Sequence, residues 1–444
     1  MGFQVGDDVE VACEDVAQGG WCVARPAGFP VLFVRHALPG ERVIARVTEV
    51  TSRFARADAV EILERSPDRV EAPCPNARPG GCGGCDWQHA ALPAQRALKA
   101  TVISQHLRRL AGVDRQVTVE PLPGDGDSDG PGMITARGGR APGLGWRTRV
   151  QFAVRGDGVA GLHAHRSHEV VDIGDCLIAH SRIRDLGIPR RDWPRTAAVE
   201  AIAGSTERAV IITPAGQRAG RGGDSRVRSG YKEGEPVPAE SVLSRAGHRL
   251  TPIRGRGYLS QRAAGRDWRV SAGAFWQVHP AAADTLTAAV LAATQPGPGD
   301  TVLDLYCGVG LFAGALAPRV GDGGVVVGIE YDQAAVRDAR HNLRDWPWAR
   351  VHRGDVAQVL RHATLPPGRL VVADPPRAGL AREVIDYLAR ESPAERFAYV
   401  SCDPATLARD LGLLLRDGWA LEDLRAFDAF PMTHHVECVA TLTR

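Results

Sequence analysis

The chain has 444 residues, of which 44% are hydrophobic and 24% charged, a composition typical of a globular protein. Since one hydrophobic core rarely extends over so many residues, this length predicts two to four domains. The formal net charge of +2 excludes a strongly basic nucleic-acid coat, so any affinity for nucleic acid must be local.

No segment suggests membrane insertion or export. Apolar runs fall short of the ~18 residues that a membrane span needs, and the first ten residues, MGFQVGDDVE, are polar and acidic rather than signal-like. Without export, the odd count of nine cysteines is not expected to form a disulfide framework. We therefore expect a cytoplasmic monomer with no membrane partner.

Residues 1–65 are predicted to form a small β-barrel. Four or five short, valine-rich segments follow one another there at regular spacing, separated by glycine and proline. Such a barrel could serve as a structural cap on a larger enzyme, or its strands could bind single-stranded RNA. The pattern favours neither interpretation.

A cysteine cluster follows in residues 66–92. Cys74, Cys82 and Cys85 lie within twelve residues, among glycines that let the backbone wrap around a metal centre. A fourth ligand would have to come from far along the chain, and Cys176 is the candidate. Four thiolates suit either zinc or an iron–sulfur cluster, and a metal-free surface loop is the alternative.

Residues 93–132 are predicted to form a helix and a linker, which we expect to pack on the C-terminal domain. Apolar residues recur at helical intervals from about residue 92 to 110. The glycine- and aspartate-rich stretch 124–132 is then predicted to be a flexible break.

Strand-like segments return from residue 144 to 180. With the cysteine cluster, they predict a β-rich central domain made of residues 66–92 and 133–268, interrupted by a polar loop at 216–235. A strip of arginines ends this domain and suits a solvated sheet face as well as an RNA-facing surface. Its members are Arg254, Arg256, Arg262, Arg266 and Arg269.

Residues 269–444 are predicted to form a Rossmann-like α/β domain. Continuous apolar strands alternate there with helices, which indicates a parallel sheet covered on both faces. In such sheets the chemistry lies at the carboxyl ends of the strands.

The loop DLYCGVG, residues 304–310, follows the first of these strands and opens a helix. Gly308 and Gly310 allow a tight turn and a close ligand, although a packing turn would use the same glycines. Glu330 ends the next strand, where an acid can bind ribose hydroxyls. The third glycine of a dinucleotide site is missing, as is a GK[ST] phosphate motif. The loop resembles the first motif of class I S-adenosylmethionine methyltransferases, which implies that Asp355 contacts adenine.

Two residues mark the reacting end. Asp374 ends the fourth strand in DPPR, where Arg377 replaces the aromatic residue of enzymes that methylate exocyclic amines. Cys402 lies between a strand and a helix that starts at Pro404, where exposed amides favour a thiolate. A buried spacer cysteine is the alternative.

Four motifs, FWQVHP, DPPRAG, SCDPATLARD and FPMTHHVECVATL, together resemble the RNA uridine 5-methyltransferase family. The N-terminal barrel matches the TRAM domain of some members, so the resemblance spans nearly the whole chain. It implies that Cys402 adds to carbon 6 of uracil and that Glu437 removes the proton from carbon 5. An edge-strand surface acid is the alternative for Glu437. The resemblance implies these S-adenosylmethionine-site residues: Gln277, Tyr306, Gly308, Gly310, Glu330, Asp355 and Asp374.

The cysteine layout resembles the four-iron cluster of the ribosomal members, although the seven residues between Cys74 and Cys82 exceed their usual spacing. Barrel and cluster together favour large-subunit ribosomal RNA as the partner, with transfer RNA as the alternative. Two further hypotheses are a catalytically silent RNA-binding factor and a methyltransferase acting on a small molecule.

Overall fold

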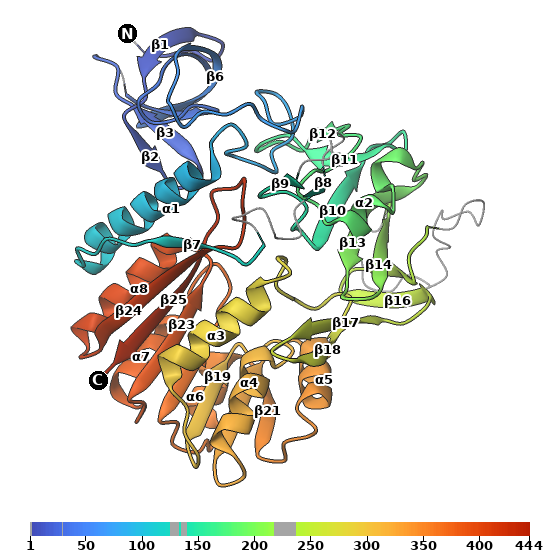
Figure 1. Ribbon diagram of the computed structural model, residues 1–444, viewed down its shortest axis with the longest axis vertical. Coiled ribbons are helices and arrows are strands. Elements are labelled where there is room, and N and C mark those ends of the chain that lie inside the picture. Colours follow the sequence, from blue (N-terminus) through green and yellow to red (C-terminus); the bar gives the residue numbers. More distant parts are fainter. Residues whose placement is uncertain (1, 29, 125–132, 135–139, 217–236) are drawn as a thin grey trace.

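A computed structural model describes residues 2–28, 30–124, 133–134, 140–216 and 237–444 (Figure 1). Apart from their first residues, the loops predicted at 124–132 and 216–235 lie outside the described residues. Within the described part of the chain, no helix is long and apolar enough to cross a membrane.

The described residues between 2 and 64 form a six-stranded sheet, at one end of the molecule in Figure 1, with the order β1-β5-β6-β4-β3-β2. Residues of β5 alternate between solvent and interior, so Val43, Ala45 and Val47 are buried on one face. The strand bounds are β1 Asp8–Ala12, β2 Asp15–Ala17, β3 Trp21–Ala24, β4 Val31–Arg35, β5 Arg42–Val50 and β6 Phe54–Glu64.

The predicted helix is confirmed as α1, Leu92–His106, which continues into a π-helical turn at Leu107–Ala111. Ile103 and Leu107 pack into a core that also contains the C-terminal strands. The short strand β7, Val119–Pro121, then pairs in parallel with β24, Ala420–Asp428. Residues 92–121 therefore pack on the C-terminal sheet.

The central region contains a seven-stranded sheet with the order β12-β11-β10-β13-β14-β15-β16. Two short elements lie beside it, the helix α2, Ser181–Arg184, and a 3-10 turn, Ile188–Arg190. A separate pair is formed by β8, Met133–Ile134, and β9, Arg140–Ala141. The remaining bounds are β10 Arg149–Val154, β11 Ala160–His163, β12 Val170–Val171, β13 Thr196–Ala203, β14 Arg208–Pro214, β15 Ser241–Ala246, β16 Arg249–Arg254, β17 Tyr258–Ala263 and β18 Arg266–Ser271.

Most of the arginine strip is engaged within the protein. Arg254 donates to two backbone carbonyls, Arg262 pairs with Asp267, and Arg269 pairs with the buried Asp338 of α5. Arg266 lies over the rings of Trp268 and Trp346. The contacts of Arg266 with Trp346 and of Arg269 with Asp338 join the β17–β18 hairpin to the C-terminal domain, which favours the structural interpretation of the strip.

The C-terminal domain is built on an eight-stranded sheet with the order β21-β20-β19-β22-β23-β25-β24-β7. Strands β19 to β23 are parallel, and β25 runs antiparallel between β23 and β24. One hydrophobic core contains residues of α3, α4 and α5, and another contains residues of α1, α6, α7 and α8. Helices therefore cover both faces of the sheet, as the Rossmann-like prediction requires.

The bounds in this domain are α3 Ala282–Thr294, β19 Thr301–Leu305, α4 Leu311–Val320, β20 Val325–Glu330, α5 Gln333–Asn342, β21 Ala349–Arg353, α6 Val356–His362, β22 Leu370–Ala373, α7 Arg382–Arg390, β23 Arg396–Ser401, α8 Pro404–Arg416 and β25 Glu437–Thr443.

Candidate active site

A cavity of about 640 Å³ opens beside the carboxyl ends of β19, β20, β22 and β23. Its lining combines apolar side chains with a few acids, the usual character of a small-molecule site. Seven of the predicted site residues line it: Gln277, Tyr306, Gly308, Glu330, Asp374, Cys402 and Glu437. Gly310 and Asp355 are not among its lining residues.

The loop after β19 shapes one end of this cavity. Tyr306, Gly308 and Gly310 all have positive φ angles, of 62°, 54° and 89°. Such a conformation is strained for tyrosine and free of strain for glycine, so the tight turn needs both glycines. A Cβ added at Gly308 would meet nothing within 4 Å, which leaves open space beside this backbone.

Glu330 is fixed by the same loop. Its Oε2 accepts a hydrogen bond from the Gly308 amide at 3.0 Å, and its Oε1 accepts one from the Asp332 amide at 2.7 Å. Each carboxylate oxygen keeps a second lone pair that can accept from a hydroxyl. Asp355 instead caps α6 by accepting from the Gln358 amide at 3.1 Å.

The other end of the cavity brings three acidic groups together. Ser401 pairs with Cys438 across the antiparallel strands β23 and β25, so the next residues, Cys402 and Glu437, emerge side by side. Asp374 reaches the same place from the end of β22, and burial raises its pKa. Burial and the charge of Asp374 also raise the pKa of Glu437, while Arg377 opposes this shift.

The Cys402 thiol does not have the lowered pKa that its place before a helix led us to expect. Burial, followed by the charge of Glu437, raises its pKa to about 12. The helix amides are already occupied, because Asp403 Oδ1 accepts from the amides of Ala405 and Thr406. The prediction of a thiolate stabilised by the start of α8 was therefore wrong, since a side chain caps that helix.

Asp403 also connects the N-terminal sheet to this turn. Its Oδ2 accepts a hydrogen bond at 2.9 Å from the side-chain amide of Gln18, which lies between β2 and β3. In this chain the carboxylate serves as helix cap and interdomain acceptor at once.

Thirteen lining residues were not among the predicted site residues, and four of them bear on the chemistry of the cavity. Phe275 and Tyr331 are 66% and 75% exposed, which is unusual for large aromatic side chains. Arg377 Nη2 lies 3.1 Å from His435 Nε2, and burial lowers the pKa of His435 to about 3, so that its ring is neutral. FWQVHP, DPPRAG and the HH pair were the sequence signals for Phe275, Arg377 and His435, and Tyr331 directly follows the predicted Glu330.

The four predicted metal ligands also share a pocket, away from the first. Cys74, Cys82, Cys85 and Cys176 line it together, and the cavity between them is about 20 Å³. Glycines make this loop possible, because a Cβ at Gly83 would approach the His165 Cα to 2.7 Å. Within the described residues, no group of three or more His, Cys, Asp or Glu side chains is arranged to hold a metal ion.

These cysteines lie in a mostly apolar, hydrogen-bonded setting. Cys82 Sγ accepts from the Gly84 amide at 3.3 Å, and Cys85 Sγ accepts from the Gln88 amide group at 3.2 Å. Burial raises the pKa of Cys85. It also raises the pKa of Cys176, to about 11. Buried thiols that accept hydrogen bonds fit cluster ligands, whose potential such bonds adjust.

Comparison with models of known protein families matches three segments of the chain. Residues 368–444 match the family model described as tRNA (Uracil-5-)-methyltransferase, and residues 2–60 match the TRAM domain. Residues 277–358, which contain the cofactor loop, match the model for Protein-L-isoaspartate(D-aspartate) O-methyltransferase.

Full-length relatives carry the assignment over the whole chain. A protein of Streptomyces coelicolor named "Uncharacterized RNA methyltransferase" is 52% identical over 450 residues, covering 99% of this chain and 93% of its own. One of Streptomyces avermitilis with the same name is 51% identical, covering 99% and 98%.

A solved structure supports the fold. The tRNA (uracil-54, C5)-methyltransferase of Pyrococcus abyssi, in complex with S-adenosyl-L-homocysteine, aligns with a TM-score of 0.68 and 24% identity. The alignment covers 98% of this chain and 99% of that one. Fold, motifs and relatives agree with the resemblance seen in the sequence, and the chain belongs to the S-adenosylmethionine-dependent RNA uracil-5-methyltransferase family.

Proposed function

We propose that this enzyme methylates carbon 5 of a uridine in a structured RNA, with Cys402 as nucleophile and Glu437 as base. The observation that carries the proposal is the meeting of Cys402, Asp374 and Glu437 in one cavity with the residues of the cofactor loop. Such a cluster of titratable groups with shifted pKa values is typical of a catalytic site.

Cys402 begins the proposed reaction. Its thiolate forms a bond to carbon 6 of uracil, and the electrons of the C5–C6 double bond move toward carbon 5 and the O4 carbonyl. Carbon 5 then forms a bond to the methyl group, whose former bonding pair leaves with the donor's sulfur. Glu437 takes the proton from carbon 5, the double bond re-forms, and the sulfur of Cys402 leaves with its electron pair.

The cofactor end fits S-adenosylmethionine in size and chemistry. Glu330 would accept from the ribose hydroxyls, while Gln277, Tyr306 and the open backbone at Gly308 would surround the rest. When bound, S-adenosylmethionine supplies an electrophilic methyl group on a positively charged sulfur, and that charge favours ionised carboxylates nearby. Asp374 and Cys402 line the same cavity, whereas Asp355 would reach adenine only from its capping position on α6.

Exposed aromatic side chains suit the entry of a nucleobase. A uridine within folded RNA must leave its stack to reach a buried thiol. Phe275 and Tyr331 at the cavity offer exposed ring faces on which an extruded base could stack. The arginine strip has a smaller part in this proposal, because most of its side chains bind other residues.

For the cysteine pocket we propose a four-iron cluster held by Cys74, Cys82, Cys85 and Cys176. The proposal rests on the four cysteines that line one pocket and on their spacing in the sequence; four thiolates suit an iron–sulfur cluster, and zinc is the alternative. Purified protein with iron, sulfide and brown absorbance would support this proposal; colourless protein with stoichiometric zinc would refute it.

Large-subunit ribosomal RNA is the first substrate to test, because TRAM domain and cysteine pocket occur together in this chain. Transfer RNA is the second, since the solved relative from Pyrococcus abyssi is named for it.

The test uses labelled S-adenosylmethionine and unmodified total RNA, followed by mass spectrometric mapping of the methylated nucleotide. A 5-methyluridine in large-subunit RNA supports the proposal in full. A mark in transfer RNA keeps the chemistry and changes the substrate. Cofactor binding without any transfer would instead favour a catalytically silent RNA-binding factor.

A further inference from the structure

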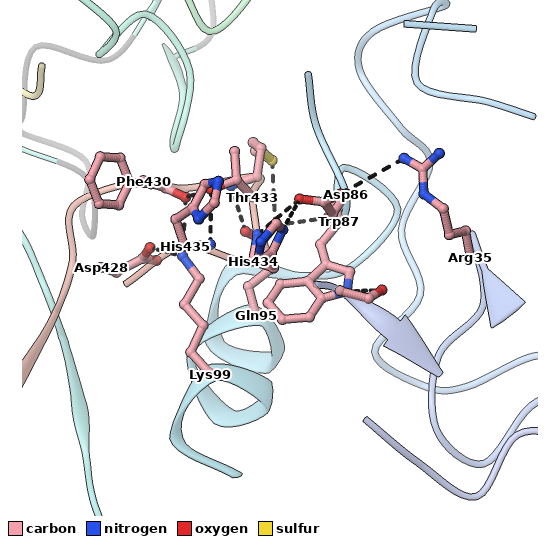
Figure 2. A network of polar contacts seen from close by, with 12 residues as sticks. Arg35, Asp86, Trp87, Gln95, Lys99, Asp428, Phe430, Thr433, His434 and His435 are labelled. Carbon is pink, nitrogen blue, oxygen red and sulfur yellow. Dashed lines mark hydrogen bonds and ion pairs between the residues drawn. The ribbon is translucent and has the colours of Figure 1, made fainter. Parts of the chain in front are cut away.

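The loop that directly precedes Glu437, the proposed base, is held by residues from outside the C-terminal domain. This catalytic loop, residues 429–436, joins β24 to β25, and β25 starts at Glu437. Figure 2 shows its residues surrounded by side chains from the cysteine region, α1 and the N-terminal sheet. At its start, Lys99 of α1 is buried and donates to both Asp428 and the Phe430 carbonyl.

The turn after Cys85 forms hydrogen bonds with the middle of this loop. The amides of Asp86 and Trp87 both donate to the Met432 carbonyl, at 2.9 and 3.0 Å. Met432 has a φ of 68°, a conformation that costs free energy in a non-glycine residue and persists only where its surroundings impose it. Gln95 accepts from the Met432 amide at 2.7 Å, so both backbone polar groups of Met432 are fixed.

Asp86 makes a second connection through its side chain. Its Oδ2 accepts from the backbone amide of His434 at 3.1 Å and lies 2.6 Å from His434 Nδ1. The His434 ring is 4.0 Å from that of His435, and His435 lines the catalytic cavity beside Arg377. One buried carboxylate thus links the cysteine turn to a side chain two residues from Glu437.

Residues of the N-terminal region also lie close to Asp86. Gly20 lies so near that a Cβ there would approach the Asp86 Cβ to 2.8 Å. The indole of Trp87 donates to the Gly20 carbonyl at 3.2 Å, and Arg35 lies 3.8 Å from Asp86 Oδ1. Asp86 is therefore enclosed by the N-terminal sheet and the catalytic loop, and it follows a proposed cluster ligand in sequence.

We propose that Asp86 is a positioning residue for methyl transfer: through His434 and Met432 it sets the catalytic loop so that Glu437 faces the uridine bound to Cys402. The proposal rests on the function proposed above. It gives the cysteine pocket a role, which is to anchor the turn that holds this loop. It also explains why the cysteine motif ends in an acid and a tryptophan.

The test compares Asp86→Ala, Asp86→Asn and His434→Ala in the full chain as it is purified. Glu41→Ala is the matched control, because Glu41 is a buried carboxylate that binds Arg69 and two backbone amides without touching the catalytic loop. Iron content, S-adenosylmethionine affinity, kcat, KM for RNA, and hydrogen exchange of residues 430–437 are measured for each protein.

We expect Asp86→Ala to lower kcat about 10- to 100-fold, the cost of a slightly misplaced catalytic group, with iron content, cofactor affinity and KM nearly unchanged. Asp86→Asn should recover part of the loss, because its amide oxygen still accepts one hydrogen bond. His434→Ala should add little to Asp86→Ala in the double variant, because both remove one connection. Because the base acts last, Asp86→Ala should also accumulate a covalent complex with ordinary uridine RNA.

Equal losses of kcat in Asp86→Ala and Glu41→Ala would overturn the proposal, as would unchanged exchange of residues 430–437. Hydrogen exchange reports the contact independently of turnover. If the wild-type protein methylates no RNA while Asp86→Ala still loosens these residues, the proposed function is wrong, and the positioning of a catalytic base is overturned with it although the contact exists.

Discussion

The two ends of the catalytic cavity differ in exposure and in how their acids are held. At the cofactor end, Glu330 binds two backbone amides, and the rings of Phe275 and Tyr331 are largely exposed. At the reacting end, Glu437 is 5% exposed, and burial raises the pKa of both Glu437 and Cys402. One end is therefore open and its acid is held by backbone amides, whereas the other end is buried and the pKa values of its acidic groups are raised.

Removing the thiol should have the largest effect. Cys402→Ala lacks the nucleophile and should lose at least about 10⁴-fold in methyl transfer, as expected for a covalent catalyst. Calorimetry should show S-adenosylmethionine binding within about twofold of wild type, since the cofactor end is untouched. Cys438→Ala, which alters a neighbouring buried thiol, is the control and should retain turnover. Measurable turnover by Cys402→Ala would contradict the mechanism.

Glu437→Gln should separate bond formation from proton removal. A general base contributes about 10²- to 10⁴-fold, so turnover should fall by that factor. Attack by Cys402 and methyl transfer precede this step, so the RNA should remain attached to the protein and migrate with it on a denaturing gel. Loss of turnover with no trapped RNA would place Glu437 earlier in the reaction.

Glu330→Ala should affect binding and spare the chemistry. Hydrogen bonds to a charged group contribute about 1.5–3 kcal/mol, so the affinity for S-adenosylmethionine should fall about 10- to 100-fold. At saturating cofactor, kcat should stay within a few-fold of wild type. Asp332→Ala, which removes the cap of α5 two residues away, controls for local loosening. An affinity loss as large in this control would show that the loop, rather than Glu330, holds the cofactor.

The pH dependence of attachment to RNA should reveal the buried thiol. Because the pKa of Cys402 is raised to about 12, the thiolate fraction at neutral pH is small and increases about tenfold per pH unit. Attachment of 5-fluorouridine RNA should therefore accelerate as pH rises from about 6.5 to 8.5. A rate that is constant over this range would mean that the thiol is already ionised.

The sequence was sufficient where spacing decides position. Cys402, Asp374 and Glu330 each follow an apolar strand, and parallel strands end at one edge of a sheet, so their meeting could be predicted. Cys176 was predicted to join Cys74, Cys82 and Cys85; the four line one pocket, and their role as metal ligands stays a prediction.

Features that depend on tertiary burial could not be predicted in this way. The capping of α8 by Asp403 removed the amides that were expected to stabilise a thiolate. The contact of Asp86 with His434 joins residues 348 positions apart. The positive φ of Met432 could not be predicted, because no glycine stands at that position. Both depend on how the N-terminal sheet, the cysteine turn and the catalytic loop pack together.

The most direct test of the account is to incubate the wild-type protein with S-adenosylmethionine and 5-fluorouridine RNA, digest the complex, and map the modified peptide by mass spectrometry. Fluorine at carbon 5 cannot leave as a proton, so the sulfur should remain bonded to carbon 6. The account predicts a methylated fluorouridine attached to Cys402. Attachment to any other cysteine, or none where ordinary RNA is methylated, would contradict it.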